Sequence, residues 1–341
     1  MGRASLMGMV AAAGLTACAP QLDPPWLLTQ PRELALEVEV VEQGPYGERL
    51  MPRPRTPRDA LPLDTIRLRP WVVDGAGPVD LDSLDAAWWM CASIGGCLTG
   101  LPVASRPACS TDQFEPSEPC RLAEGAETTV RLADIPAQQL EPSSALDLLN
   151  GITVGFMASP EGGPGLDTCI ARLDARQPLG ECLLMERLLG VGPLSDLVAL
   201  IEALGGDVGL ELGETLLARP RNYNPAVMEL SVSYGSTSVR VPAGTRLSVP
   251  RNVEVLVGIV PDDQDLDSYE VIVAEQLVLF SDDLTTQWWF DARVDRTDTL
   301  PGQLTARWSA DGAVDEVRAY VVLRDNRGGE ALGWLDFELE G

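Results

Sequence analysis

The stretch Glu33-Leu-Ala-Leu-Glu-Val-Glu-Val40 decides the fold class. Apolar side chains occupy every second position in it, at Leu34, Leu36, Val38 and Val40. Glu37 and Glu39 lie between them. Because successive side chains of a β-strand point to opposite faces, this period of two predicts a strand with one buried and one exposed face.

Similar short strands are predicted on both sides of a central region. Before residue 160 they fall at Thr65–Val73, Ala86–Ser93, Thr128–Leu132 and Ile152–Ala158. A second series starts near Ala226 and continues through Val253–Ile259, Tyr269–Ile272, Gln287–Val294, Leu304–Ser309, Val317–Leu323 and Trp334–Leu339. Short strands separated by Gly, Pro, Asn and Asp turns are typical of β-sandwiches. We therefore expect a mostly β chain with two immunoglobulin-like sandwich domains in tandem, at 27–160 and 218–341.

Each series contains a tryptophan pair, Trp88-Trp89 in the first and Trp288-Trp289 in the second. Both pairs follow an acidic stretch and lie at a similar distance after the first strand of their series, which indicates a duplicated sandwich. One tryptophan of each pair is expected to fill the core, and its neighbour to be partly exposed. The alternative is an aromatic platform for a ligand.

The region 161–217 differs from both series. Pro193-Leu-Ser195 is typical of a helix start, followed by an apolar face that ends at Gly205-Gly206. Leu183–Leu189 is also predicted to be helical. Cys169 and Cys182 would close this region into a short helical, disulfide-clipped insert between the two domains.

The N-terminus predicts export and lipid attachment. Residues 1–17 read as a signal peptide, with Arg3 ahead of a short apolar run. Leu15-Thr-Ala-Cys18 resembles a bacterial lipobox, in which the cysteine is acylated and becomes the new N-terminus. We therefore expect Cys18 to anchor the chain in a lipid bilayer through a tether at 18–26. Ala19 favours the outer membrane, at its periplasmic face or the cell surface.

The other six cysteines form an even set, as expected of disulfides in an oxidising compartment. They are Cys91, Cys97, Cys109, Cys120, Cys169 and Cys182. Sequential pairing closes the shortest loops and is preferred among the several possible pairings. A zinc site is disfavoured because the chain has no C-x-x-C pair and no histidine.

Composition excludes several classes of function. A formal charge of −26, from 51 acidic and 25 basic residues, disfavours binding to nucleic acid. Every basic residue is arginine. Without histidine or lysine the chain has no Ser-His-Asp triad, Cys-His dyad, P-loop lysine or Schiff-base lysine. Among catalytic classes, only carboxylate chemistry of the glycosidase kind stays open. Because the other classes are excluded, the chain is predicted not to be an enzyme.

Two charged segments are candidate binding sites. Asp263, Asp265 and Asp267 recur at every second position and are followed by Glu270, which could direct oxygen ligands toward Ca²⁺. A solvated loop between strands is the alternative reading. Four arginines in a proline-rich loop at Arg49–Arg58 could dock an acidic partner or a lipopolysaccharide-type anion, or could simply balance nearby carboxylates.

Three further stretches carry a resemblance to a known group. They are Arg221-Asn-Tyr-Asn-Pro225, Val241–Leu247 and Tyr320–Gly329. Together with the lipobox and Trp88–Cys91, they make the chain similar to uncharacterised myxobacterial-type lipoproteins, which typically carry two immunoglobulin-like β domains after a lipobox. The resemblance implies a location and a fold, and no activity.

The sequence thus predicts a membrane-anchored lipoprotein with a non-enzymatic binding or structural role at the cell envelope. Its partners would be the bilayer and an envelope protein or glycan that contacts loops or an edge strand. The alternatives are a calcium-assisted carbohydrate-binding lipoprotein, which would need exposed tryptophans, and a carboxylate-only hydrolase.

Overall fold

The structure of the 341-residue chain is a computed structural model. It describes residues 25–45, 63–91, 97–98, 102–109, 119–132, 152–190, 223–262, 268–273, 276–296, 304–310 and 314–341. Within these ranges the chain is mostly β, as predicted, with one α-helix, α2 (Leu166–Asp174), and two 3₁₀ turns, η1 (Leu81–Ser83) and η2 (Val103–Ser105). None of the described helices is long and apolar enough to cross a membrane.

The first sandwich contains two four-stranded sheets. In one sheet, β2 pairs with β1 on one side and with both β3 and β6 on the other. In the second sheet the order is β5-β4-β7-β8. The strands are β1 (Arg32–Glu42), β2 (Thr65–Asp74), β3 (Gly77–Pro78), β4 (Asp85–Cys91), β5 (Cys120–Glu124), β6 (Thr128–Arg131), β7 (Ile152–Ser159) and β8 (Leu183–Leu189).

The second sandwich pairs a five-stranded sheet, β10-β9-β12-β17-β16, with a four-stranded sheet, β11-β19-β18-β15. A separate hairpin, β13–β14, lies between β12 and β15 in the chain. The strands are β9 (Glu229–Tyr234), β10 (Thr237–Pro242), β11 (Arg246–Pro250), β12 (Val255–Val260), β13 (Ser268–Val273), β14 (Gln276–Ser281), β15 (Thr285–Phe290), β16 (Val294–Arg296), β17 (Thr305–Ala310), β18 (Glu316–Arg324) and β19 (Glu330–Glu340).

Both strand orders follow the immunoglobulin scheme, in which strands A, B, E and D form one sheet and C, F and G the other. In the second sandwich these roles fall to β9-β12-β17-β16 and β15-β18-β19. In the first, β1-β2-β6 correspond to A, B and E, and β4-β7-β8 to C, F and G. The tryptophan pairs lie on β4 and β15, which are equivalent strands, as the duplicated pattern predicts.

The prediction that Leu183–Leu189 is helical is wrong. These residues form β8, which pairs antiparallel with β7 from Ile152 to Ala158. The segment has apolar residues at spacings that suit either period, and the pairing to a fully buried neighbour decides in favour of a strand. The first sandwich therefore continues past residue 160, and β8 supplies the strand that corresponds to G. The helix predicted from Pro193 lies outside the described residues.

The first strand also differs from the prediction in one respect. Leu36, Val38 and Val40 point into the first core, but Leu34 lies with Ala35 in a different cluster. The pairing of β1 with β2 is irregular between Glu33 and Ala35. A bulge of this kind changes which face the following residues occupy, so the alternation holds only beyond it.

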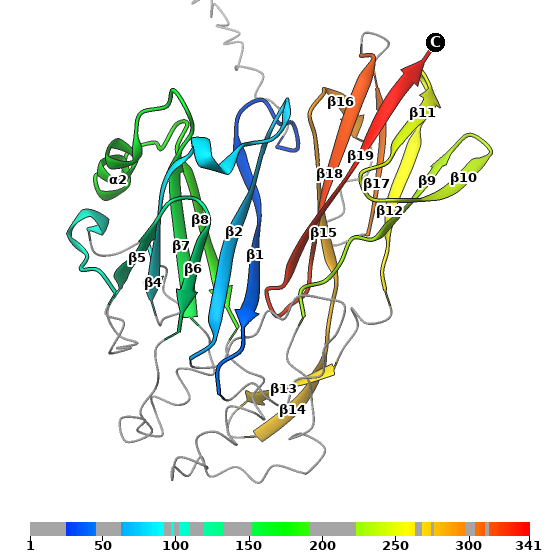
Figure 1. The fold of residues 1–341 in the computed structure, drawn as a ribbon. Coiled ribbons are helices and arrows are strands. Elements are labelled where there is room, and N and C mark those ends of the chain that lie inside the picture. Colours follow the sequence, from blue (N-terminus) through cyan, green and yellow to red (C-terminus); the bar gives the residue numbers. More distant parts are fainter. Residues whose placement is uncertain are drawn as a thin grey trace, which may run out of the picture.

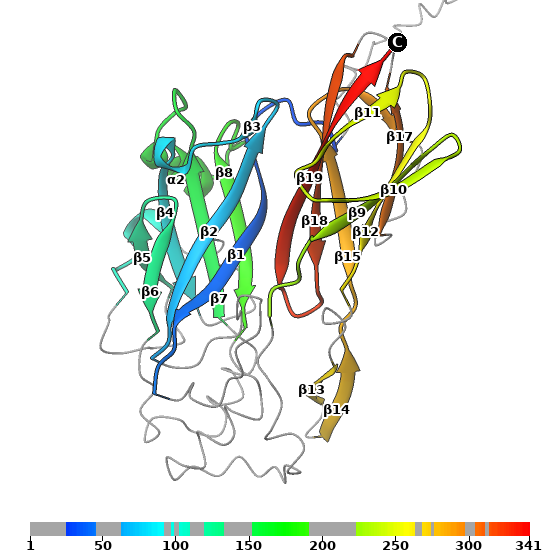
Figure 2. The same ribbon diagram turned by 45° about the vertical axis from the view of Figure 1, so that its right-hand side comes forward.

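Figures 1 and 2 show the four large sheets side by side, with α2 against the outer sheet of the first sandwich. One apolar core lies within each sandwich. A third apolar cluster lies under α2 and η2, on the outer face of the β5-β4-β7-β8 sheet. The fourth lies where β1 and β2 meet β15, β18 and β19, so the two sandwiches are joined through an apolar contact.

Candidate functional site

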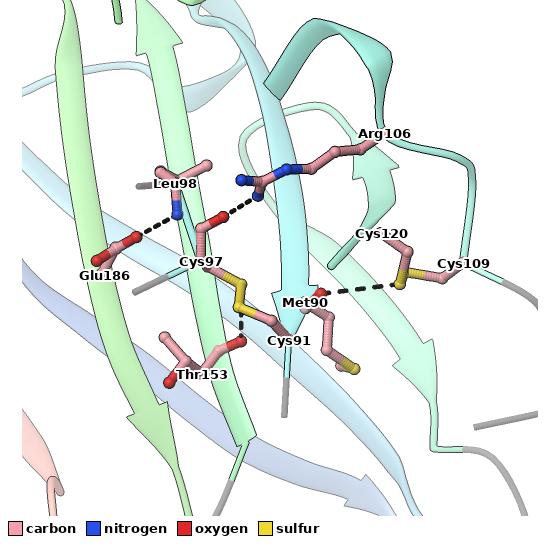
Figure 3. Close-up of a disulfide and its surroundings, with 9 residues drawn as sticks. All are labelled: Met90, Cys91, Cys97, Leu98, Arg106, Cys109, Cys120, Thr153 and Glu186. Carbon is pink, nitrogen blue, oxygen red and sulfur yellow. Dashed lines mark hydrogen bonds between the residues drawn. A yellow bond between two sulfur atoms is a disulfide. The ribbon is translucent and has the colours of Figure 1, made fainter. Parts of the chain in front are cut away.

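The six cysteines predicted to form disulfides are paired sequentially, as preferred from the sequence. The bonds are Cys91–Cys97, Cys109–Cys120 and Cys169–Cys182. Figure 3 shows the first two on neighbouring parts of the same sheet, with the Arg106 guanidinium donating to the carbonyl oxygen of Cys97. The Glu186 carboxylate on β8 accepts from the backbone N–H of Leu98. These bonds hold residues 97–98 and 102–109 against the outer sheet.

All four tryptophans of the two pairs are buried. Trp88 and Trp288 fill the first and second cores, as predicted. Their neighbours were expected to be partly exposed, but Trp89 is 1% and Trp289 4% exposed. The reason is a further layer on each sheet: α2 and η2 cover Trp89, and the first sandwich covers Trp289. The aromatic platform is therefore overturned.

The predicted calcium ligands Asp263, Asp265 and Asp267 lie outside the described residues, as does Cys18. Glu270 belongs to β13. Among the described residues, no group of three or more acidic or cysteine side chains is placed to hold a metal ion. Calcium binding at this loop stays a prediction, and the Arg49–Arg58 loop is likewise outside the described part of the chain.

The most distinctive polar site that the structure describes is the junction between the sandwiches. Its centre is Glu330, the first residue of β19, whose side chain is 3% exposed. One carboxylate oxygen, Oε1, accepts from Arg324 Nε at 2.5 Å and from Arg187 Nε at 3.0 Å. The other, Oε2, accepts from the backbone N–H of Leu36 at 2.5 Å. Three donors thus satisfy a charge whose burial would otherwise be costly.

These donors come from both sandwiches. Arg324 is on β18 in the second, whereas Arg187 on β8 and Leu36 on β1 belong to the first. Arg324 also donates to the carbonyl oxygen of Leu34 at 2.8 Å and to Gln287 Oε1 at 3.1 Å. Farther along β1, Asn224 Nδ2 donates to the carbonyl oxygen of Val38 at 2.6 Å. The junction therefore has directional bonds as well as apolar contact.

The N-terminal segment adds a second connection between the sandwiches. Trp26 and Leu28 bond to Phe290 at the end of β15, through Phe290 N–H to Trp26 O and Leu28 N–H to Phe290 O, both at 2.9 Å. Leu27 forms a parallel bridge to Phe290. The chain therefore lies along the second sandwich before it enters β1 of the first.

A polar cavity of about 330 Å³ opens at the junction beside Glu330. Arg32, Arg187 and Arg324 line it together with Glu33 and Trp289. Burial raises the pKa of the Glu33 carboxyl, and the nearby Arg187 and Arg32 oppose that rise. Arg324 donates to Glu330, to Gln287 and to the carbonyl oxygen of Leu34, and Arg187 donates to Glu330. The polar groups that line the cavity therefore mainly hold the two sandwiches together.

Sequence reasoning missed this junction. Glu330 follows the turn Asn326–Gly329, and nothing in its neighbourhood marks a buried carboxylate. The segment Leu183–Leu189, which contains Arg187, was predicted to be helical. The one usable signal was the alternation in β1, because a strand with apolar residues on both faces near Leu34 and Ala35 is covered on both sides.

No protein-family model matches the chain, and no curated protein matches it. Among solved structures, the crystal structure of dimeric latent PorU from Porphyromonas gingivalis is similar at a TM-score of 0.20 and 11% sequence identity. That similarity covers 92% of this chain and 24% of the PorU chain, so this chain spans about a quarter of PorU's length. At that TM-score the likeness carries no argument about fold or function.

The fold and the junction define a class: a mostly β, disulfide-bonded protein built from stacked sandwich sheets, with a buried carboxylate joining them.

Proposed function

We propose that the chain is a lipid-anchored lipoprotein with a non-enzymatic binding or structural role at the cell envelope. The observation that carries the proposal is the attachment of Trp26–Leu28 to β15, directly after the predicted tether. Through this attachment and Glu330, an anchor at Cys18 would hold both sandwiches as one body. A protein that presents a binding surface from a membrane needs such a connection between anchor and body.

The disulfides support the location. Three disulfides lie within residues 91–182, and disulfides persist in oxidising compartments such as the periplasm and the cell surface. Cys18 is the seventh cysteine and is left over for acylation. Export and lipid attachment are thus consistent with the complete use of the cysteines.

The tether length sets an orientation on the membrane. Trp26 lies eight positions after Cys18, a stretch that spans about 27 Å when fully extended. The Phe290 end of β15 would then stay close to the bilayer. The hairpin β13–β14 lies beyond the opposite end of β15, as Figures 1 and 2 show, so it would face away from the membrane. Its exposed Val278 and Leu279 would be available to an envelope partner.

The carbohydrate-binding alternative loses its aromatic platform, since Trp88, Trp89, Trp288 and Trp289 are all buried. Only the predicted calcium loop still favours it, and a calorimetric titration with Ca²⁺ would test that loop directly. We therefore propose a protein partner ahead of a glycan.

The test is chemical crosslinking in intact cells that express the wild-type chain, Cys18→Ala, or Gln21→Ala as the matched control within the tether. We expect the wild type and Gln21→Ala to fractionate with membranes and carry acyl chains, and to crosslink to the same partners. Cys18→Ala should be released and lose those partners. Membrane fractionation of Cys18→Ala equal to that of the wild type would refute the anchoring, and an unchanged set of partners would refute its role.

The orientation is tested separately by energy transfer from a dye on the chain to acceptor lipids in vesicles that carry the acylated protein. Ala76, in the turn between β2 and β3, is near the attached N-terminal segment, since the neighbouring Gly75 approaches the carbonyl oxygen of Leu28. Asp283, just before β15, is at the far end. A dye at Ala76 should transfer more energy than a dye at Asp283. Equal or reversed transfer would refute the orientation.

A further inference from the structure

The hairpin β13–β14 belongs to neither sandwich. Its two strands pair with each other, and neither pairs with any other strand that the structure describes. Figures 1 and 2 show it standing apart from the large sheets, beyond the end of β15. A two-stranded sheet on its own is marginally stable, because no further strand or layer covers it. A partner that adds a strand would therefore stabilise the hairpin.

Three consecutive apolar side chains of β14 face solvent. The exposed fractions are 37% for Val278, 60% for Leu279 and 40% for Phe280. Because side chains alternate along a strand, Leu279 lies on one face of the hairpin and its two neighbours lie on the other. None of the three belongs to an apolar cluster that the structure describes. Contiguous exposed apolar residues are typical of a surface that binds another protein.

The outer edge of β14 has open backbone groups. Two residues separate β13 from β14, and the pair that closes such a connection is hydrogen-bonded. Since the direction of the backbone groups alternates along an antiparallel pair, the N–H and C=O groups of Leu277 and Leu279 point away from β13. Among the described residues, none outside the hairpin bonds to these groups. At the same edge, the carbonyl oxygen of Ser281 accepts from Asn326 Nδ2 at 3.2 Å, so one position of the edge already holds a donor.

The root of the hairpin is fixed to the second sandwich. Asp282 directly follows β14, and its side chain is 3% exposed. Its two carboxylate oxygens accept from Arg327 at 2.9 and 2.6 Å. Arg327 lies in the turn between β18 and β19, where its backbone N–H donates to Asp325 at 2.9 Å. Because this end of β14 is held in place, a partner strand loses little free energy to ordering it.

The charge of this part of the chain restricts the partner. No basic residue occurs between Arg251 and Arg293. The acidic residues in or next to the hairpin are Asp262, Asp263, Asp265, Asp267, Glu270, Glu275, Asp282 and Asp283. A second copy of the chain would bring like charges together, and an anionic bilayer would be repelled. An extended segment that carries basic residues is complementary to both the charge and the open edge.

We propose that the outer edge of β14 binds an extended segment of a partner protein, in which apolar residues lie between basic residues. The segment adds a third strand to the hairpin through the backbone groups of Leu277 and Leu279. Its apolar side chains pack beside Val278, Leu279 and Phe280. The inference rests on the proposed function, because it names the chemistry of the partner that the hairpin would meet.

The test measures the binding of dye-labelled peptides to the full chain in a non-ionic detergent, by fluorescence anisotropy. The probe is Arg-Val-Thr-Val-Thr-Val-Arg-amide. One control peptide has glutamate in place of both arginines, and the other has proline in place of the central valine, which prevents regular strand pairing. We expect the probe to saturate the protein and both controls to bind more weakly, on the order of tenfold.

Hydrogen exchange locates the bound peptide. The amides of Leu277 and Leu279 should exchange more slowly when the probe is bound, because their N–H groups gain an acceptor. The amide of Val278 should change less, since it already pairs with β13. Raising the salt concentration from about 0.05 M to about 0.5 M should weaken binding several-fold, because salt screens exposed charges.

The variants make the result specific. Leu279→Lys removes an exposed apolar side chain and places a charge at the open edge, so binding should weaken on the order of tenfold. Met228→Lys makes the same kind of change at a residue outside the hairpin that is 65% exposed, and it should bind like the wild type. Leu279→Pro removes an N–H that makes no bond to β13 and should also weaken binding. Leu279→Lys serves if the proline variant does not fold.

Equal binding of the basic and acidic peptides, unchanged exchange at Leu277 and Leu279, or full binding by Leu279→Lys would overturn the proposal. Sedimentation checks for self-association, and a dimer that Leu279→Lys disrupts would assign the edge to a second copy and overturn the proposal as well. Because the protein is in detergent, a failure of the peptide to bind refutes this edge as the site and leaves the anchor untouched. The anchor is tested separately by the membrane fractionation of Cys18→Ala.

Discussion

Replacing Glu330 should destabilise the chain more than any other single change on β19 outside its apolar face. Glu330→Ala removes the acceptor of three hydrogen bonds, from Arg324, Arg187 and the Leu36 N–H. It also leaves two arginines without their buried counter-charge. Breaking a buried ion pair by removing one partner costs about 3–5 kcal/mol. That loss is a large fraction of the ~5–15 kcal/mol by which a typical domain is stable.

Glu330→Gln removes the negative charge of the side chain and keeps its shape, so it measures the contribution of the charge alone. The amide keeps one oxygen acceptor, but the two arginine bonds lose their charge assistance, at about 1 kcal/mol each. We therefore expect a loss of about 2 kcal/mol for Gln, roughly half of that for Ala. Glu338→Ala is the control, because Glu338 is an exposed glutamate on the same strand, and it should stay within about 0.5 kcal/mol of wild type.

The assay is urea denaturation followed by tryptophan fluorescence, together with amide hydrogen exchange. The Leu36 amide should exchange faster in Glu330→Ala, because it loses its acceptor, whereas amides in the core of β18 should keep their protection. A Glu330→Ala variant as stable as Glu338→Ala, with unchanged Leu36 exchange, would show that the carboxylate does not hold the junction.

Three further predictions concern other parts of the chain. Burial raises the pKa of Asp291, whose Oδ1 accepts from the backbone N–H of Arg318 at 2.7 Å. Because ionisation is harder in the folded state, the stability of the wild type should fall relative to that of Asp291→Asn as pH rises above about 3.8. A difference in melting temperature between the two proteins that does not change between pH 3 and 7 would contradict this. Replacing Cys169 and Cys182 together by alanine opens a loop of 13 residues and should lower the free energy of unfolding in urea by about 3 kcal/mol. The variant should still be more stable than the fully reduced wild type, because its other two disulfides stay closed. Gly333→Ala should cost about 1–3 kcal/mol by overpacking, because a β-carbon there would lie 2.4 Å from Val227 Cγ1; an unchanged denaturation midpoint would refute that contact.

The sequence predicted the parts of the fold that depend on local alternation. The strands β2, β4, β7, β12, β18 and β19 lie where the pattern placed them, with ends that differ by a few residues. Trp88 and Trp288 were correctly assigned to the cores, because an apolar side chain this large in a strand has few other places to go. The sequential disulfides were the pairing that loop length favoured among several that the sequence left open.

What the sequence did not predict depends on contacts between distant segments. The strand character of Leu183–Leu189 comes from its pairing with β7, and the burial of Trp89 and Trp289 comes from layers supplied by α2 and by the other sandwich. Leu34 lies on a different face from Leu36, Val38 and Val40 because of a bulge in β1. Glu330 finds its partners 143 and 294 residues away in the chain, at Arg187 and Leu36, and no local pattern encodes such a pairing.

The placement of the disulfides has a consequence for how the chain matures. All six disulfide cysteines lie between residues 91 and 182, so the second sandwich, from β9 onward, has no cysteine. If the chain is exported as proposed, the half that leaves the export channel first is the half that waits for oxidation, while the later half can acquire its structure without it. Glu330 and β15 would then offer the earlier half a finished surface on which to assemble, so the completed C-terminal sandwich would act as a template for the N-terminal one.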